Sequence, residues 1–332
     1  MSFRIRASRQ DDLSALYEMA KLTGGGFTNL PPEKGVLEAK LGRSAEALAR
    51  QQDRLDDDLI VLVLEEVATG QVRGTCQLFS QVGLRVPFYS YRIGTLTQYS
   101  QALQRTFRAE LLTLCTDFEG ASEVGGLFLH PQERAGGLGA LIARSRYLYI
   151  RRHRPRFAAT LIAELRGVID EAGGSPFWDG LAGKFFGMTF QEADEFNATN
   201  GHQFIADLFP KHPIYTALLP DSARSVVGVP HPTGRPAMRM LEAEGLSHDR
   251  YIDIFDGGPT VHAATDRVLT VAASTEVEVR AIGPVEAPRR IASTGRLADF
   301  RAAYVRLEDD VLHPDDAQLL AVEPGMTLLV AP

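Results

Sequence analysis

The feature that most restricts the fold of this chain is a junction where an apolar run passes through a glycine-rich turn into a helical pattern. The run "SEVGGLFLHP" predicts a strand over residues 122–131, and apolar residues at helical spacing predict a helix over about residues 138–152. Gly136, Gly137 and Gly139 stand at the junction despite their backbone entropy cost. Such glycines allow a tight loop whose free N–H groups, with the positive end of the next helix, form a cradle for an anion.

The spacing at this junction narrows the kind of anion. Arg134, Gly137 and Gly139 fit the pattern Arg/Gln-x-x-Gly-x-Gly/Ala. A P-loop is excluded because its spacing and its Lys-Ser/Thr are absent, and the dinucleotide fingerprint is excluded because Gly-x-Gly-x-x-Gly is absent. The order of strand, pattern and helix resembles the pyrophosphate loop of the acetyl-CoA N-acyltransferase superfamily. The alternative is a helix start that the glycines merely loosen.

The composition indicates a globular protein with room for two domains. The chain has 332 residues, of which 45% are hydrophobic and 23% charged, with a formal net charge of -7. This acidic balance argues against nucleic-acid or membrane partners. Cys76 and Cys115 lack metal-ligand spacing. They predict buried thiols, no metal site and a cytoplasmic location.

Helical and strand patterns alternate along the chain, which predicts an α+β fold with a largely antiparallel sheet. Two apolar runs around Thr69–Gly70 predict a hairpin. Residues 33–54 predict a mostly polar, half-exposed helix. The run "YIDIFDGGPTVHA", residues 251–263, predicts a single strand.

Longer stretches carry a more specific resemblance. They are "LTGGGFTNLP", "VGLRVPFYSYRIGT", "SEVGGLFL", "AELRGVIDEAGGSPFW", "KFFGMTFQEAD", "PKHPIYTALLP", "VGVPHP" and "YIDIFDGGPT". In this order they closely resemble the arginine N-succinyltransferase family, from about Arg4 to Arg267.

The resemblance implies a reaction and an architecture. The reaction is transfer of succinyl from succinyl-CoA to the α-amino group of L-arginine, giving N2-succinyl-L-arginine and CoA in arginine catabolism, with succinyl-CoA as co-substrate and no permanently bound cofactor. The fold would be two tandem acyl-CoA N-acyltransferase-like halves, residues 1–198 with the phosphate loop and residues 199–332, which exchange C-terminal strands. A homo-oligomer, or a hetero-oligomer with a paralogous subunit, is implied as well.

Two site residues follow from the resemblance. Leu127 matches the succinyl-CoA-binding leucine of the family, where a strand backbone pairs with the pantetheine amides. His231 matches the family's proton donor. Because histidine titrates near neutral pH, it can protonate the departing CoA thiolate or relay a proton from the amine. From the residues alone, a histidine beside a proline in a loop is more often structural.

The charged groups that the substrates need are not assigned by the resemblance. Arg92 and Arg166 are candidates for the succinyl carboxylate, because both lie in or beside strands, although each would equally serve an internal ion pair. The arginine side chain needs a carboxylate, for which the candidates are Glu123, Glu164, Asp253 and Asp256. Glu123 is alternatively a base for the amine, and Asp256 alternatively starts a turn. Arginines also cluster on and after the predicted helix 138–152. They indicate either a solvated helix end or contacts with the adenosine phosphates of CoA.

The chain also departs from the family pattern. Gly125–Gly126 replace a Cys-Thr, "TQYS" at residues 97–100 lacks a histidine, and the tail after about Val271 is hard to match. Two alternatives therefore stay open. One is a sibling acyltransferase with altered substrate, and the other is a non-catalytic paralogous subunit or an acyl-CoA-binding sensor. A hydrolase is excluded by the absence of a Gly-x-Ser-x-Gly elbow.

Overall fold

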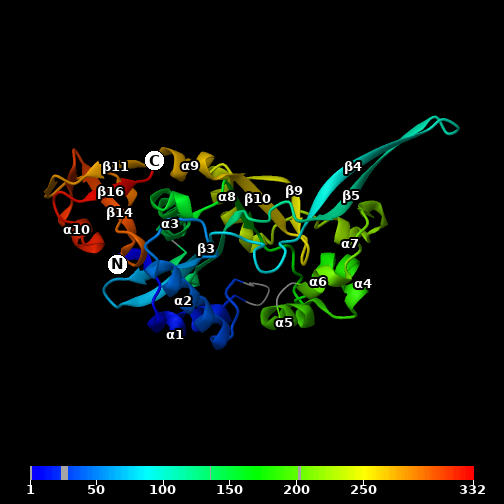
Figure 1. The fold of residues 1–332 in the computed structure, drawn as a ribbon, viewed down its shortest axis with the longest axis horizontal. Coiled ribbons are helices and arrows are strands. Elements are labelled where there is room, and N and C mark those ends of the chain that lie inside the picture. The colour runs from blue at the N-terminus through cyan, green and yellow to red at the C-terminus, as the bar shows by residue number, and fades with distance from the viewer. Residues whose placement is uncertain (1, 24–28, 135, 201–202) are drawn as a thin grey trace.

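The computed structural model describes residues 2–23, 29–134, 136–200 and 203–332. It is an elongated molecule with one long twisted sheet, from which a two-stranded arm projects (Figure 1). Within the described residues the sheet has sixteen strands, and most neighbouring strands pair antiparallel. The predicted α+β class with a largely antiparallel sheet is confirmed.

The strands span the whole chain. In sequence order they are β1 (Phe3–Ala7), β2 (Leu59–Glu66), β3 (Gln71–Phe79), β4 (Ser90–Ser100), β5 (Arg105–Cys115), β6 (Ser122–Leu129), β7 (Thr160–Glu164), β8 (Ile214–Tyr215), β9 (Ser247–Asp253), β10 (Pro259–Ala264), β11 (Thr275–Glu278), β12 (Ala281–Ile282), β13 (Arg289–Thr294), β14 (Arg301–Glu308), β15 (Val311–Leu312) and β16 (Thr327–Val330).

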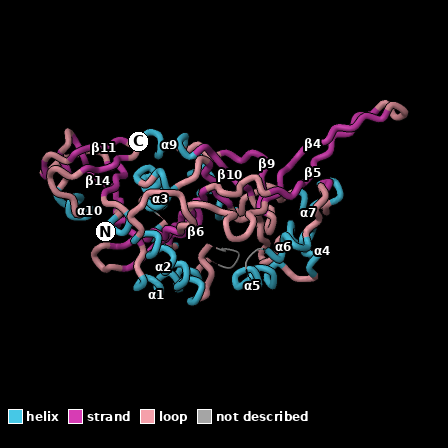
Figure 2. The backbone as a smooth tube through the Cα atoms, in the orientation of Figure 1, coloured by secondary structure: helices cyan, strands magenta, loops and turns pink. Residues whose placement is uncertain are grey.

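The helices are mostly short and lie against the sheet or at its ends (Figure 2). They are α1 (Leu13–Lys21), α2 (Lys34–Ala49), α3 (Leu138–Arg152), α4 (Gly183–Phe186), α5 (Phe190–Asn200), α6 (Gln203–Leu208), α7 (Asp221–Arg224), α8 (Arg235–Ala243), α9 (Leu269–Ala273) and α10 (Pro314–Leu320). Within the described residues, no helix has the length and apolarity that a membrane span requires.

Fourteen of the strands follow the order β11-β16-β13-β14-β1-β2-β3-β6-β7-β10-β9-β4-β5-β8, and beside this path β15 pairs with β14 and β12 with β15. Strands from the last third of the chain therefore join on both sides of the N-terminal strands, with β14 beside β1 and β10 beside β7. The division into 1–198 and 199–332 with exchanged C-terminal strands stays a prediction. The single strand expected over residues 251–263 is wrong, because a turn at residues 254–258 splits it into β9 and β10.

Strands β6 and β7 run parallel at the middle of the sheet, and they part after a short distance. They pair only at Ser122 with Leu161 and at Glu123 with Ile162, after which β6 continues to Leu129. Along this stretch, the edge of β6 that faces β7 has no strand partner among the described residues. The two strands therefore splay and open a gap in the ladder.

A β-bulge in β6 lies at the start of this splay. The register against β3 shifts between Thr75 and Gln77, opposite Gly126, which has a φ of 57°. Val124 packs in the core beneath α3, whereas Phe128 packs in the cluster of α1 and α2 on the other face. Residues four apart in a regular strand share a face, so the extra residue of the bulge turns the strand over.

Candidate functional site

The glycine-rich junction forms the N-terminus of α3, as predicted. Gly137 precedes the helix with a φ of 80°, a conformation that favours glycine, and the first intrahelical bond runs from the Leu141 N–H to the Gly137 oxygen. The N–H groups of residues 138–140 therefore lack a helical acceptor, as at any helix start. Arg134 lies exposed before the loop, and a Cβ on Gly139 would meet nothing within 4 Å. This open, positive end is suited to an anion.

The C-terminal sheet supports this loop. The Tyr304 hydroxyl on β14 donates a hydrogen bond of 3.0 Å to the Gly137 carbonyl oxygen. A Cβ on Gly137 would lie 2.9 Å from that hydroxyl. Gly137 is thus held both by its backbone conformation and by a residue 167 positions away, which the sequence pattern did not reveal.

Leu127 lies directly after the bulge residue Gly126, on the stretch of β6 that has left β7. Its side chain is half-buried and packs against the core beneath α3. The strand thus presents backbone to the splay and leads into the loop at the N-terminus of α3. The two groups of residues predicted for CoA binding are therefore joined by one strand.

His231 lies beyond the end of β7. Its backbone N–H donates 2.8 Å to the carbonyl oxygen of Arg166. Thr233 occupies the ring atom Nδ1 through its hydroxyl at 2.7 Å and its backbone N–H at 3.3 Å, which leaves Nε2 as the nitrogen available for proton exchange. Burial, followed by the charge of Arg166, lowers the pKa of His231 below its usual 6.5.

Four carboxylates interact with one another, and one of them, Asp256, acts on Arg166. They belong to Glu123 on β6, Glu164 at the end of β7, Asp253 at the end of β9 and Asp256 in the turn after it. Burial raises the pKa of Glu123 to about 7 and that of Asp256 to about 8, with Asp253 adding to both. The pKa of Glu164 is raised well above its usual value by burial and by the other three carboxylates. A buried cluster of this kind favours a cationic ligand.

The acids differ in how much of their hydrogen-bonding capacity is already used. Both oxygens of Asp256 accept backbone bonds, from Gly167 at 2.7 Å and from Gly258 at 2.8 Å, so this residue holds the turn together. Asp253 accepts from the N–H groups of residues 255 and 256. Glu164 accepts only a long bond of 3.3 Å from Thr260 among the contacts seen in the described chain.

The two arginines predicted for the succinyl carboxylate lie in different surroundings. The Nε of Arg166 is buried with no hydrogen-bond acceptor in the described chain, and the guanidinium is near the carboxylates of Asp256 and Asp194. Arg92 lies on β4 with an exposed side chain and pairs with Asp117 at 3.4 Å. The structure thus brings His231, Arg166 and Asp256 together, whereas Glu123 joins them only through Asp253 and Arg92 pairs with Asp117 instead.

The arginine cluster around α3 is largely committed to internal contacts. Arg144 pairs with Glu244 at 3.0 Å, Arg154 with Asp266 at 2.6 Å, and the buried Arg156 with Asp53 at 2.9 Å. Arg152 donates to the carbonyl oxygen of Ser293. These contacts tie α3 and the residues after it to neighbouring segments, which accounts for much of the cluster without CoA.

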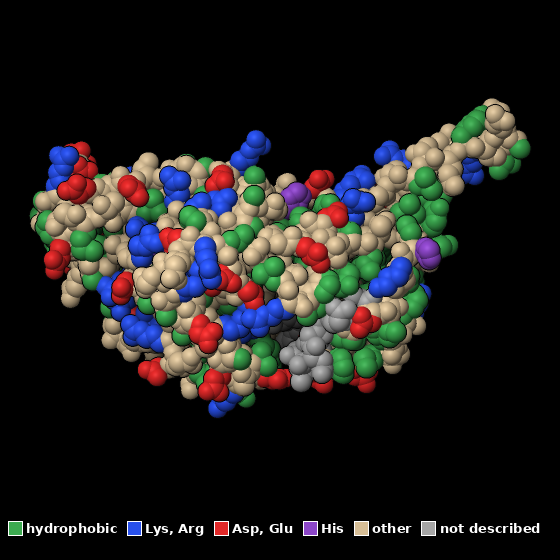
Figure 3. Space-filling model, in the orientation of Figure 1, with side chains coloured by type: hydrophobic (Ala, Val, Ile, Leu, Met, Phe, Trp, Pro, Cys, Tyr) green, Lys and Arg blue, Asp and Glu red, His purple; other side chains and the backbone are tan. Residues whose placement is uncertain are grey.

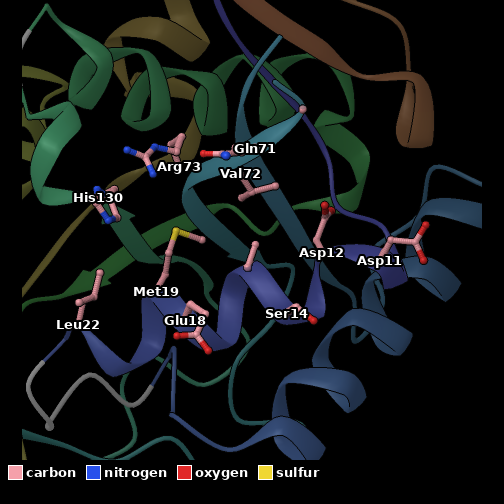
Figure 4. A pocket seen from close by; sticks show the side chains of 12 residues that line it. Asp11, Asp12, Ser14, Glu18, Met19, Leu22, Gln71, Val72, Arg73 and His130 are labelled. Carbon is pink, nitrogen blue, oxygen red and sulfur yellow. The ribbon is translucent and has the colours of Figure 1, made fainter. Parts of the chain in front are cut away.

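A separate hollow of about 460 Å³ lies between α1, the start of β3 and His130, which follows β6 (Figure 4). Asp11, Glu18 and Met19 line one side, and Arg73 and His130 the other. Arg73 is already paired with Glu133 at 2.9 Å. The residues that line this hollow include none of those predicted for the site. In the described ranges, no three His, Cys, Asp or Glu side chains are placed so that they could hold one metal ion.

Sequence reasoning missed Lys40. It lies on α2, in a segment predicted as a mostly polar, half-exposed helix, and its Nζ donates to the Asn29 carbonyl oxygen at 2.8 Å and to Gln77 Oε1 at 3.3 Å. Burial lowers the pKa of Lys40 to about 8, against the charge of Glu123. No local pattern marks this lysine, because its surroundings come from β3 and from the segment before α2.

Comparison with known proteins gives the family. The family described as "Arginine N-succinyltransferase beta subunit" matches residues 3–270. The arginine N-succinyltransferases of Salmonella paratyphi B and Salmonella newport are each 40% identical over 306 residues, covering 92% of this chain and 89% of the relative. Arginine/ornithine succinyltransferase subunit AI from Pseudomonas aeruginosa superposes with a TM-score of 0.92 at 30% identity, over 99% of this chain and 98% of that one.

These matches agree with the residues that carried the resemblance, and the family match ends near the tail that was hard to align. The shared fold extends further, since the Pseudomonas structure covers nearly the whole chain. From the strand-loop-helix cradle, the splayed strands and these relatives, the chain belongs to the arginine N-succinyltransferase family.

Proposed function

We propose that this protein transfers the succinyl group of succinyl-CoA to the α-amino group of L-arginine, giving N2-succinyl-L-arginine and CoA. The observation that carries the proposal is the splay of β6 and β7, which opens beside an anion cradle on one side and a cluster of buried acids on the other. The family membership supplies the reaction class.

The CoA moiety would lie along the free stretch of β6. Its pyrophosphate would bind the N–H groups at the start of α3, at Gly137 and Gly139, with Arg134 beside them. The pantetheine amides would pair with the backbone of Leu127 as an added strand. The thioester would then reach the bulge, near the end of β7.

The acyl transfer needs one proton to move. The amine nitrogen forms a bond to the thioester carbonyl carbon, the C–S bond breaks, one proton leaves the nitrogen and one reaches the sulfur. His231 is suited to both transfers through Nε2, because its lowered pKa keeps much of it neutral at pH 7 and able to accept the amine proton first. Glu123 is a second candidate base, with a pKa of about 7.

The charged groups of the substrates have candidate partners of opposite charge near the splay of β6 and β7. Arg166, with its unpaired buried Nε, is the better candidate for a carboxylate, and the exposed, paired Arg92 the weaker one. Glu164 has more capacity for the guanidinium than Asp256, whose oxygens hold the turn, whereas Glu123 already accepts a side-chain hydrogen bond from Asn29. The assignments of Glu123, Arg166 and Asp256 remain proposals.

We further propose an oligomer, either of this chain or with a paralogous subunit, in the cytoplasm. The apolar residues exposed on the arm support association, and the two free thiols support a reducing compartment.

The proposal is tested by mixing the protein with succinyl-CoA and L-arginine and following CoA release together with the mass of the product. Turnover to N2-succinyl-L-arginine is expected. Binding of succinyl-CoA without CoA release would instead identify an acyl-CoA sensor or an inactive subunit. Turnover only with another amine or acyl-CoA would identify a sibling acyltransferase.

A further inference from the structure

Lys40 is a half-buried cation whose contacts leave it room for another ligand. Helix α2 presents it to the middle of β3, where Nζ donates to the Asn29 carbonyl oxygen and to Gln77 Oε1. Gln77 Nε2 donates to the same Asn29 oxygen at 2.7 Å, so the three residues form one network. A lysine ammonium has three protons, and two acceptors are seen for it among the described residues.

This network touches the bulge of β6. A Cβ on Gly126 would lie 2.8 to 2.9 Å from three atoms of the Gln77 side chain. A Cβ on Gly125 would lie 2.7 Å from Asn29 Nδ2 and 3.0 Å from Glu123 Oε1. The two glycines therefore give these side chains access to the strand, and Lys40 is one side chain away from the bulge.

The charge of Lys40 is incompletely balanced at this place. Glu123 is the carboxylate that acts on it, and burial raises the pKa of Glu123, which weakens this acid as a counterion. The two hydrogen-bond acceptors of Lys40 are neutral oxygens. A half-buried ammonium with such partners is stabilised by an incoming carboxylate.

We propose that Lys40 binds a substrate carboxylate at the β6 bulge, as a second cation besides Arg166. The inference rests on the proposed function, in which both substrates bring a carboxylate, one at the end of the succinyl group and one on the amino acid. Both would approach the bulge, where the thioester and the amine meet. Two substrate carboxylates then have two protein cations.

The experiment compares ligands that differ only in the carboxylate. Calorimetry measures binding of succinyl-CoA against butyryl-CoA, and of L-arginine against agmatine, which is arginine without its α-carboxylate, in the presence of CoA. The variants are Lys40→Met and Lys40→Arg. Lys34→Met is the matched control, because it removes an exposed charge from the first turn of the same helix.

The parent should bind succinyl-CoA more tightly than butyryl-CoA and L-arginine more tightly than agmatine. Lys40→Met should reduce one of these two affinity ratios by about tenfold or more, while Lys40→Arg and Lys34→Met retain it. Loss of the preference for succinyl-CoA assigns the acyl carboxylate, and loss of the preference for arginine assigns that of the amino acid. If both ratios in Lys40→Met equal those of the parent, the proposal is refuted and Lys40 is a structural counterion of Glu123. Absence of turnover by the parent would refute the proposed function alone, because the binding ratios require no chemistry.

Discussion

The residues proposed for proton transfer and those proposed for CoA binding are positioned by different contacts. His231 takes its place from a backbone bond to Arg166 and presents Nε2, whereas Gly139 contributes only backbone and open space. Gly137 resembles Gly139 in the sequence pattern but not in its surroundings, since its positive φ and the Tyr304 hydroxyl both exclude a side chain. A substitution at Gly137 would therefore disturb the loop itself.

The first prediction concerns proton transfer by His231. His231→Gln should lower kcat by about 10²–10⁴, towards the low end because a thiolate leaves without much help, and should leave CoA affinity unchanged. In the parent, kcat/KM should rise with pH through the lowered pKa of His231, below 6.5, because the neutral ring accepts the amine proton. That inflection should vanish in the variant.

A matched variant distinguishes the competing base. Glu123→Gln should leave the inflection of His231 in place. If kcat/KM of the parent instead has its inflection near pH 7, and that inflection is absent in Glu123→Gln, the base is Glu123. Burial raises the pKa of Glu123 to about 7. Loss of activity in His231→Gln through unfolding or weakened CoA binding would make His231 structural.

The second prediction concerns the anion cradle. Gly139→Val should weaken succinyl-CoA binding by about tenfold or more, because the side chain fills the space where the phosphate would meet the backbone N–H groups. The fold should persist, since a Cβ there meets nothing within 4 Å. Gly35→Val is the control, because Gly35 also occupies the second position of its helix in open space. Equal affinity of both variants would show that the pyrophosphate binds elsewhere.

At the level of elements, three departures from regularity build the site. The bulge turns β6 over, the short pairing of β6 with β7 opens the ladder, and the turn at residues 254–258 brings Asp253 and Asp256 to Glu164. Helix α3 is in turn fixed to the C-terminal part of the chain through its last residues. His153 is fully buried there, with Nδ1 bonded to the Tyr149 carbonyl oxygen at 3.0 Å and Nε2 accepting from the Leu297 N–H at 3.2 Å.

The third prediction is an acid-sensitive contribution from His153. Burial lowers its pKa from 6.5 to about 4, so the folded protein holds the neutral ring while the unfolded chain binds a proton more readily. The contribution of the neutral His153 ring to the free energy of unfolding is complete above pH 6.5 and is lost as the pH falls towards 4. The loss is up to about 3 kcal/mol, at 1.36 kcal/mol per unit of pKa. Urea unfolding at pH 7.5 and 5.0 should show a smaller decrease for His153→Gln than for the parent.

The comparison between variants is needed because buried acids act in the opposite direction. The raised pKa values of Glu123, Glu164 and Asp256 make the folded protein less stable as the pH rises. Their effect is common to the parent and to His153→Gln. An equal decrease in both proteins between pH 7.5 and 5.0 would show that His153 does not titrate on unfolding in this range.

For the whole molecule, the arm of β4 and β5 is the least self-supporting part. The two strands pair over eleven residues each, and the arm leaves the body with few neighbours (Figure 3). Tyr99, Leu103 and Phe107 are 57%, 75% and 49% exposed near its end. A two-stranded ribbon is marginal in water by itself, and we therefore propose that contact with another subunit stabilises this arm.

The fourth prediction tests this contact. The double variant Leu103→Ser and Phe107→Ser should lower the mass found by light scattering, without changing the circular dichroism of the body. Leu218→Ser is the control, because Leu218 is 78% exposed but lies outside the arm. An unchanged mass in the double variant would exclude the tip of the arm as the contact. If the parent is monomeric by itself, the same test is made with the paralogous subunit.

The sequence determined the parts of this protein that depend on neighbours along the chain. Strand and helix periods, the junction from Arg134 to Gly139 and the family motifs were sufficient for the fold class, the start of α3 and the family, because hydrophobic period and turn chemistry are local. Contacts between distant segments required the tertiary structure. Lys40 at the bulge, Tyr304 on Gly137 and the group of four acids join residues far apart in the chain. Burial, together with the neighbouring carboxylates, raises the pKa of Glu164 in that group. A pairing of this kind depends on which strands become neighbours, and no spacing in the sequence encodes it.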